Sequence, residues 1–227
     1  RPDLECRLIL VATNTGFAPI WSIAVAALRE NPQRSMMIIA GGRSTRMGAE
    51  KALAMVAGKP ILQHIVERIA PQVDALALNA NGDSSRFASI GVPVIADLRG
   101  DIGTPLAGLH AGLHWASSQG FDAMLSLPSD CPFLPRDLTA RLDAGTLPAI
   151  ASSGGERHVL TGLWPSSLLA ALDTALGDGG MFRVKDWAAL VKARSVEWTV
   201  EPFDPFLNVN TPEELAEANR IAAELPP

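Results

Sequence analysis

Short runs of hydrophobic residues alternate along the chain with longer segments whose apolar positions recur every three or four residues. The short runs predict strands at residues 8–12, 36–40, 75–79, 92–96, 123–127, 149–152 and 196–200. The periodic segments predict helices at residues 60–70, 105–117, 135–144, 166–176 and 211–225. Such alternation is typical of a parallel sheet covered by helices on both faces. We therefore predict an α/β fold in three layers, α/β/α, with a mostly parallel sheet.

The last predicted helix carries a clear start signal. Thr211 can cap it, Pro212 suits the first helical position, and Glu214 completes a capping box.

The first 35 residues differ from the rest. A predicted strand at 8–12 is followed by the turn Thr13-Asn-Thr-Gly-Phe-Ala-Pro19 and a helical stretch that ends before Asn31-Pro32. This segment resembles the Thr-Gly-x-Ala-Pro turn in the nicotinamide-binding half of ferredoxin reductases. The likeness covers one strand, one turn and one helix, which is too little for a dinucleotide site. We predict that residues 1–35 form an appended segment and residues 36–227 the main domain.

Composition narrows the classes of function. The chain has 227 residues, 48% of them hydrophobic and 19% charged, as expected for a packed globule. Its 19 basic and 24 acidic residues give a net charge of −5, which argues against a broad nucleic-acid-binding face but allows a local basic pocket. Cys6 and Cys131 lie far apart and lack metal-ligand spacing. No apolar run reaches membrane-spanning length and no leader peptide is visible, so we expect a cytoplasmic protein.

A glycine-rich basic segment follows the predicted strand at 36–40. It reads Ile39-Ala-Gly-Gly-Arg-Ser-Thr-Arg-Met-Gly-Ala-Glu-Lys51. Glycines let the main chain approach a polyphosphate closely, and Arg46 and Lys51 would neutralise the charge that grows on it during bond breaking. The segment has neither Walker nor Rossmann glycine spacing, and a plain glycine turn with solvated basic residues is the alternative.

This segment resembles the signature of the molybdenum cofactor nucleotidyltransferases. Further stretches match the guanylyltransferase branch of that family in the same order. They are Leu78-Asn-Ala-Asn81, Pro105-Leu-Ala-Gly-Leu109 and Leu207-Asn-Val-Asn-Thr-Pro-Glu-Glu-Leu215. The likeness extends from about Met36 to the C-terminus, and it implies a Rossmann-like nucleotidyltransferase fold.

The resemblance also implies roles for individual residues. The main chain of Ile39, Ala40 and Gly41 would line the nucleotide, and Lys51 would bind phosphate. Asn79 and Asp97 would contact the guanine nucleotide. A turn-forming role is the alternative for Asn79, because residues 79–83 are rich in turn formers.

Asp130 is the candidate metal ligand. It follows the predicted strand at 123–127, in a loop stiffened by Pro128 and Pro132. A carboxylate at a strand tip suits magnesium, which takes few carboxylates together with phosphate oxygens and water. The family match implies the same metal role and contact with the nucleotide, and capping of the following helix is the alternative.

The sequence departs from the family pattern at two places. Glu50 replaces the usual aspartate before Lys51. The stretch 155–160 lacks the family's His-Pro after the arginine, which weakens the assignment of Arg157 to the pterin side. Asn208 and Asn210 are the other candidates there, or groups near the metal.

The expected activity is transfer of GMP from GTP to the molybdopterin cofactor, with magnesium and with release of pyrophosphate. The expected partners are these two substrates, and molybdoenzymes or their chaperones as recipients of the product. We expect a monomer that binds neither nucleic acid nor membrane. The alternatives are a cytidylyltransferase that uses CTP, a sugar-nucleotide pyrophosphorylase, a non-catalytic GTP-binding adaptor and, from residues 1–35 alone, a nicotinamide-linked reductase.

Overall fold

The computed structural model describes residues 32–40, 52–100, 102–177, 180 and 183–225. The chain divides into two units, Arg1–Glu30 and Asn31–Pro227, and the fold below is that of the second. The strand and helix expected before residue 31 lie outside the described residues, as do Gly41, Arg46, Glu50 and Lys51.

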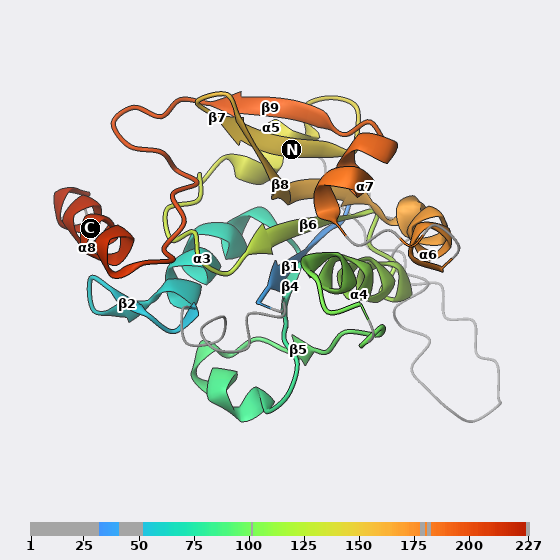
Figure 1. The fold of residues 1–227 in the computed structure, drawn as a ribbon, viewed down its shortest axis with the longest axis horizontal. Coiled ribbons are helices and arrows are strands. Elements are labelled where there is room, and N and C mark those ends of the chain that lie inside the picture. The colour runs from blue at the N-terminus through green and yellow to red at the C-terminus, as the bar shows by residue number, and fades with distance from the viewer. Residues whose placement is uncertain (1–31, 41–51, 101, 178–179, 181–182, 226–227) are drawn as a thin grey trace, which may run out of the picture. The chain divides into compact units, whose positions relative to one another are not determined.

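A seven-stranded sheet forms the centre of this unit (Figure 1). Its order is β5-β4-β1-β6-β8-β7-β9. Neighbouring strands are parallel except that β8 runs antiparallel to both β6 and β7. The strands are β1 (Arg34–Ile39), β4 (Ala75–Asn79), β5 (Val94–Ile95), β6 (Ala123–Pro128), β7 (Ala149–Ser153), β8 (Glu156–Pro165) and β9 (Arg194–Trp198). A separate hairpin joins β2 (Met55–Val56) to β3 (Lys59–Pro60). The expected mostly parallel α/β sheet is confirmed.

Side chains of the central strands alternate between two hydrophobic cores, one on each face of the sheet. Met36 and Ile38 of β1 belong to one core, and Met37 and Ile39 belong to the other. The first core packs against α3 (Ile61–Ile69), α5 (Leu138–Asp143) and α8 (Pro212–Glu224), and the second against α4 (Pro105–Ser118), α6 (Leu169–Gly177) and α7 (Val184–Leu190). This period-two alternation is what a strand buried on both faces requires.

Three short 3-10 helices complete the described elements: η1 (Ala70–Gln72), η2 (Ser84–Ile90) and η3 (Ser166–Leu168). The capping box predicted for the last helix is present, because Thr211 Oγ1 accepts from the Glu214 N–H and the Glu214 carboxylate accepts from the Thr211 N–H. Within the described part of the chain, no helix is both long and apolar enough to cross a bilayer.

The sequence did not predict β8, α7, the β2–β3 hairpin or η2. The first half of β8 carries exposed polar residues, and Gly162 interrupts its apolar half, so the strand lacks a clean alternation. Gly162 is required there because a Cβ would lie 2.8 Å from the ring of Trp164. The seven-residue α7 is too short to show a helical period convincingly.

The strand order reverses at β1. The chain moves from β1 to β4 and β5 on one side and then returns to β6 on the other. In open α/β sheets, ligands bind beyond the carboxyl ends of the strands at such a switch point. β1 ends at this point with Ile39, and Ala40 follows it.

Candidate active site

The carboxyl ends of four parallel strands form one row across the sheet. Ile39 of β1 is in register with Asn79 of β4 and with Pro128 of β6, and Asn79 is in register with Ile95 of β5. Asp97 and Asp130 each follow this row by two residues. The nucleotide-side and metal-side candidates therefore lie at the same edge of the sheet, on opposite sides of β1.

Asn79, Asn81 and Asp97 form a hydrogen-bonded cluster at this edge. The amide nitrogen of Asn79 donates to Asp97 Oδ1 at 2.9 Å, and that of Asn81 donates to Asp97 Oδ2 at 2.7 Å. The Asp97 N–H in turn donates to Asn81 Oδ1 at 2.9 Å. Each carboxylate oxygen can accept a second hydrogen bond, so the cluster presents a fixed, partly buried acceptor pair. Asn81 is a member of this cluster that sequence reasoning did not assign, although it stands in the matched Leu-Asn-Ala-Asn stretch.

Asn79 is completely buried, which sets it apart from an ordinary turn former. Its Nδ2 also donates to the carbonyl of Ile95 at 3.1 Å, and its Oδ1 has no hydrogen-bond partner within the described part of the chain. Gly108 of α4 packs directly against it, since a Cβ at that position would lie 2.3 Å from Asn79 Oδ1. Close contact with α4 therefore helps to hold the amide in place.

The loop after β6 positions Asp130, which is partly buried. The main-chain carbonyl of Asp130 accepts from the Val209 N–H at 2.9 Å, so this loop is joined to the segment before α8. Cys131 lies next to it with 2% exposure, and its Sγ is 2.8 Å from Asn208 Oδ1. Burial raises the pKa of the Cys131 thiol well above its usual value, and the nearby Asp130 and Asp204 carboxylates raise it further.

Asn208 and Asn210 are both exposed at this edge. Asn208 is attached to the Asp130 loop through the Cys131 thiol. The Asn210 N–H donates to the Glu214 carboxylate at 2.6 Å, which connects it to the start of α8. The structure thus brings Asn208 beside the candidate metal ligand.

Arg157 is not part of this group. Its guanidinium donates to the carbonyl of Ala193, which belongs to the core on the far face of the sheet. The next residue, His158, points to the opposite face because side chains alternate along β8. Its ring stacks on Phe206 with centroids 4.6 Å apart, and Phe206 belongs to the same core as Cys131.

His158 belongs to a polar network that sequence reasoning missed. His158 Nε2 is 2.7 Å from Ser153 Oγ, and that hydroxyl lies 2.9 and 3.0 Å from the two oxygens of Asp204. A serine hydroxyl has one proton to donate. With an ionised Asp204 as its acceptor, His158 must donate to Ser153 through Nε2–H. The network joins the β7–β8 hairpin to the 204–210 segment, and only the loosely matched stretch at 155–160 signalled it.

Burial lowers the pKa of His158 from its usual value of 6.5, although the Asp204, Glu156 and Glu197 carboxylates partly oppose this. Because the folded state binds the proton less readily than the unfolded state, His158 stabilises the fold fully above pH 6.5 and loses this contribution as the pH falls through its lowered pKa.

We expect His158→Gln, which keeps a side-chain N–H donor, to lose less stability than the wild type on acidification. Urea unfolding at about pH 7.5 and about pH 5 measures this difference. The two proteins differ only at residue 158, so the comparison reports on the histidine together with its interactions with Asp204, Glu156 and Glu197. An equal loss in both would contradict the burial of the neutral imidazole.

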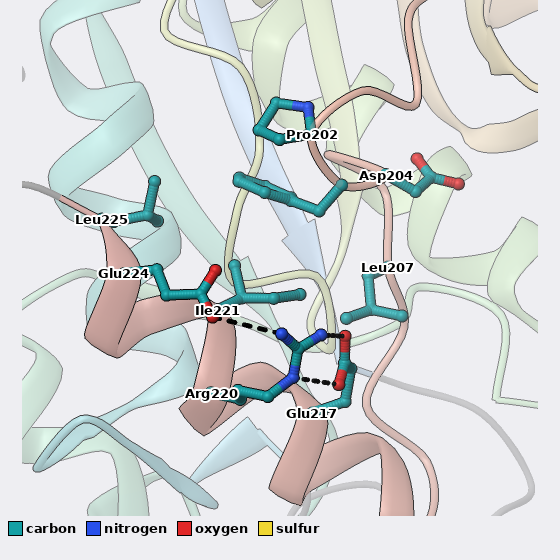
Figure 2. Close-up of a pocket in the computed structure, with 9 residues that line it drawn as sticks. Pro202, Asp204, Leu207, Glu217, Arg220, Ile221, Glu224 and Leu225 are labelled. Carbon is teal, nitrogen blue, oxygen red and sulfur yellow. Dashed lines mark hydrogen bonds and ion pairs between the residues drawn. The ribbon is translucent and has the colours of Figure 1, made fainter.

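A pocket of about 320 Å³ adjoins this region (Figure 2). Pro202, Phe203, Asp204 and Leu207 line it from the 202–207 segment, and α8 and the residue after it, Leu225, contribute the rest of the lining. Within α8, Arg220 forms ion pairs with Glu217 and Glu224. Apart from Asp204, the pocket contains none of the residues discussed above, so it borders the candidate site rather than forming it.

Part of the main chain at the end of β1 is already hydrogen-bonded within the sheet. The Ala40 N–H donates to the carbonyl of Asn79 at 3.0 Å, so Ala40 can offer a ligand only its carbonyl. Main-chain N–H groups that bind the phosphates must therefore belong to residues after Ala40.

The candidate metal position is the carboxylate of Asp130, which offers oxygen donors. Among the described residues there is no group of three or more histidine, cysteine or acidic side chains that could hold a metal ion. Asp130 would offer a metal ion a hard carboxylate oxygen, whereas burial raises the pKa of the adjacent Cys131 thiol and so keeps it protonated. This donor set suits an ion that takes its remaining ligands from phosphates and water, as magnesium does.

Comparisons with known proteins find relatives over most of the chain. The model of the MobA-like NTP transferase domain matches residues 36–195. A molybdenum cofactor guanylyltransferase from Rhodopseudomonas palustris is 46% identical over 203 residues, which cover 86% of this chain and 97% of that protein. A relative of the same name from Bradyrhizobium is 45% identical over 82% of this chain and 92% of its own length.

Solved structures share the fold. The molybdopterin-guanine dinucleotide biosynthesis protein A of Archaeoglobus fulgidus has a TM-score of 0.62 at 22% identity, with 84% of this chain and all of that chain covered. The family model spans most of the domain, and the Rhodopseudomonas relative matches almost end to end. The chain therefore belongs to the MobA-like NTP transferase family.

Proposed function

We propose that this protein transfers GMP from GTP to the molybdopterin cofactor and releases pyrophosphate. The main support is the 46% identity to a molybdenum cofactor guanylyltransferase over 97% of that relative's length. In this reaction a terminal phosphate oxygen of the pterin forms a bond to the α-phosphorus of GTP. The bond from that phosphorus to the β-phosphate bridging oxygen breaks, and its electron pair leaves with pyrophosphate.

The Asn79–Asn81–Asp97 cluster is the proposed site for the guanine base. Guanine carries N–H donors at N1 and at its exocyclic amine, which match the free lone pairs of the Asp97 carboxylate. Cytosine offers an amino donor beside two acceptors, and those acceptors would face the carboxylate unfavourably. The two asparagine amides keep the carboxylate in one orientation, and this arrangement favours GTP over CTP.

Three residues, Asp130, Arg46 and Lys51, would balance the negative charge of the triphosphate. We propose that Asp130 holds Mg²⁺, which when bound neutralises charge on the triphosphate oxygens. Arg46 and Lys51 would stabilise the departing pyrophosphate, and the main chain after Ala40 would lie against the phosphates. Such a substitution depends on positioning and charge neutralisation, and it needs no covalent intermediate with the protein.

Pyrophosphate release measured with molybdopterin and either GTP or CTP tests the proposal. We expect GTP to be preferred by at least about a hundredfold, because CTP would leave hydrogen-bonding groups of the cluster unpaired. A preference for CTP would identify a cytidylyltransferase. Binding of GTP with no turnover in the presence of pterin would identify a non-catalytic adaptor.

The product would pass to molybdoenzymes or their chaperones, and the enzyme would act as a monomer in the cytoplasm. Arg157 is a weaker pterin-side candidate than Asn208, because its guanidinium is engaged on the far face of the sheet.

A further inference from the structure

Cys131 lies between the loop that carries Asp130 and the segment that carries Asn208 and Asn210. Its side chain is almost completely buried, with 2% exposure. Sγ is surrounded by oxygen atoms: Asn208 Oδ1 at 2.8 Å, the Phe206 carbonyl at 3.6 Å and Asp130 Oδ1 at 3.8 Å. A thiol has one proton to donate, and by distance its acceptor is Asn208.

This hydrogen bond determines how the Asn208 amide is oriented. The amide is planar, so when Oδ1 faces the buried sulfur, Nδ2 points away from it. Asn208 is exposed, and within the described part of the chain its Nδ2 has no hydrogen-bond partner. The amide thus offers two N–H donors to solvent or ligand, in a loop joined to Asp130 through the Val209 N–H.

We propose that Cys131 is a positioning residue that aims the Asn208 amide nitrogen at the phosphate of the acceptor. The inference rests on the proposed function, in which a phosphate oxygen must approach the α-phosphorus beside Asp130. Two N–H donors next to a carboxylate suit a phosphate oxygen, whereas an amide oxygen in that place would repel it. Cys131 has no contact with substrate in this scheme and acts through Asn208.

Enzyme kinetics of four variants test whether Cys131 acts through Asn208. The variants are Cys131→Ala, Cys131→Ser, Asn208→Ala and the double variant Cys131→Ala/Asn208→Ala. We expect Cys131→Ala to lower kcat/KM for molybdopterin roughly three- to tenfold, the worth of one hydrogen bond, and to leave KM for GTP within about twofold. Cys131→Ser keeps a donor and should restore most of the activity. The double variant should be no slower than Asn208→Ala, because both changes remove the same interaction.

Ser35→Ala is the matched control. Ser35 is fully buried in β1, and its hydroxyl has no hydrogen-bond partner among the described residues. It lies at the amino end of the strand, away from the candidate site. The variant removes a buried polar group of similar size, and we expect it to leave the kinetics unchanged.

Independent effects of Cys131→Ala and Asn208→Ala in the double variant would overturn the inference. Failure of a folded Cys131→Ser protein to recover activity would do the same. Side-chain amide NMR signals separate this test from the proposed function. We expect the Asn208 NH₂ pair, identified by its absence in Asn208→Ala, to shift in Cys131→Ala, and an unchanged pair overturns the inference even if the protein transfers no nucleotide.

Discussion

Replacement of Asp130 by asparagine is expected to reduce guanylyl transfer at least about a thousandfold. Asparagine has nearly the same shape as aspartate, and the main-chain link from Asp130 to Val209 does not involve the side chain. The fold should therefore persist. The variant lacks the charge that would hold Mg²⁺ against the triphosphate, and the cost of an unneutralised phosphate in a closed site is several kcal/mol.

Pyrophosphate release over a range of Mg²⁺ concentrations measures this effect. Asp186→Asn serves as control, because Asp186 is an acid of α7 that pairs with Arg183 on the other face of the sheet. The control should retain full activity, and both variants should melt close to the wild type. An Asp130→Asn protein with a near-native rate would remove the metal role from this residue.

Replacement of Gly108 by alanine is expected to weaken GTP binding by about ten- to a hundredfold, because misplacement of binding groups by about 1 Å has effects of this size. The new Cβ would lie 2.3 Å from Asn79 Oδ1 and 2.8 Å from Ile39 Cγ2, and both side chains are buried. Real Cβ atoms do not approach other atoms so closely. Asn79 must therefore move, and its hydrogen bond to Asp97 would be lost or bent.

Isothermal titration of GTP with Mg²⁺ measures the affinity, and urea unfolding measures the stability. Gly112→Ala, one turn along α4, is the matched control. Its Cβ would lie 3.0 Å from Met37 Cβ and 3.1 Å from Met124 Sδ, so it crowds the core without touching the cluster. We expect both variants to lose stability, by about 1–3 kcal/mol, with the larger loss for Gly108→Ala, and we expect native GTP affinity for Gly112→Ala. Native affinity in folded Gly108→Ala would argue against Asn79 and Asp97 as the nucleotide site.

Much of the fold could be predicted because local pattern and tertiary environment agree in the central strands. β4 was predicted with its exact bounds, since each of its neighbours in the sheet is itself a short apolar strand. The start of α8 was predicted because a capping box is a local interaction. β8 was missed because its first residues, Glu156–His158, are polar and not buried, so the sequence has no apolar period there.

The candidate site was only partly predictable. The family resemblance made Asn79, Asp97 and Asp130 candidates, and the structure places Asn79 at the end of β4 and the two aspartates two residues beyond β5 and β6. The resemblance could not show that Asn81 shares the Asp97 carboxylate, since 16 residues separate them. It also could not show that the Arg157 guanidinium donates to the carbonyl of Ala193 while the next side chain, His158, stacks on Phe206, because neighbouring residues of a strand point to opposite faces.

The sequence alone determined the α/β class, the family resemblance and the residue types that follow each central strand. These depend on local periodicity and on short motifs, which a linear reading contains. Only the tertiary structure decided which of those residues meet: Asn79 with Asp97, Cys131 with Asn208, and Ser153 with His158 and Asp204. The physical reason is that strand register and loop packing set these distances, and both depend on contacts between segments far apart in the chain.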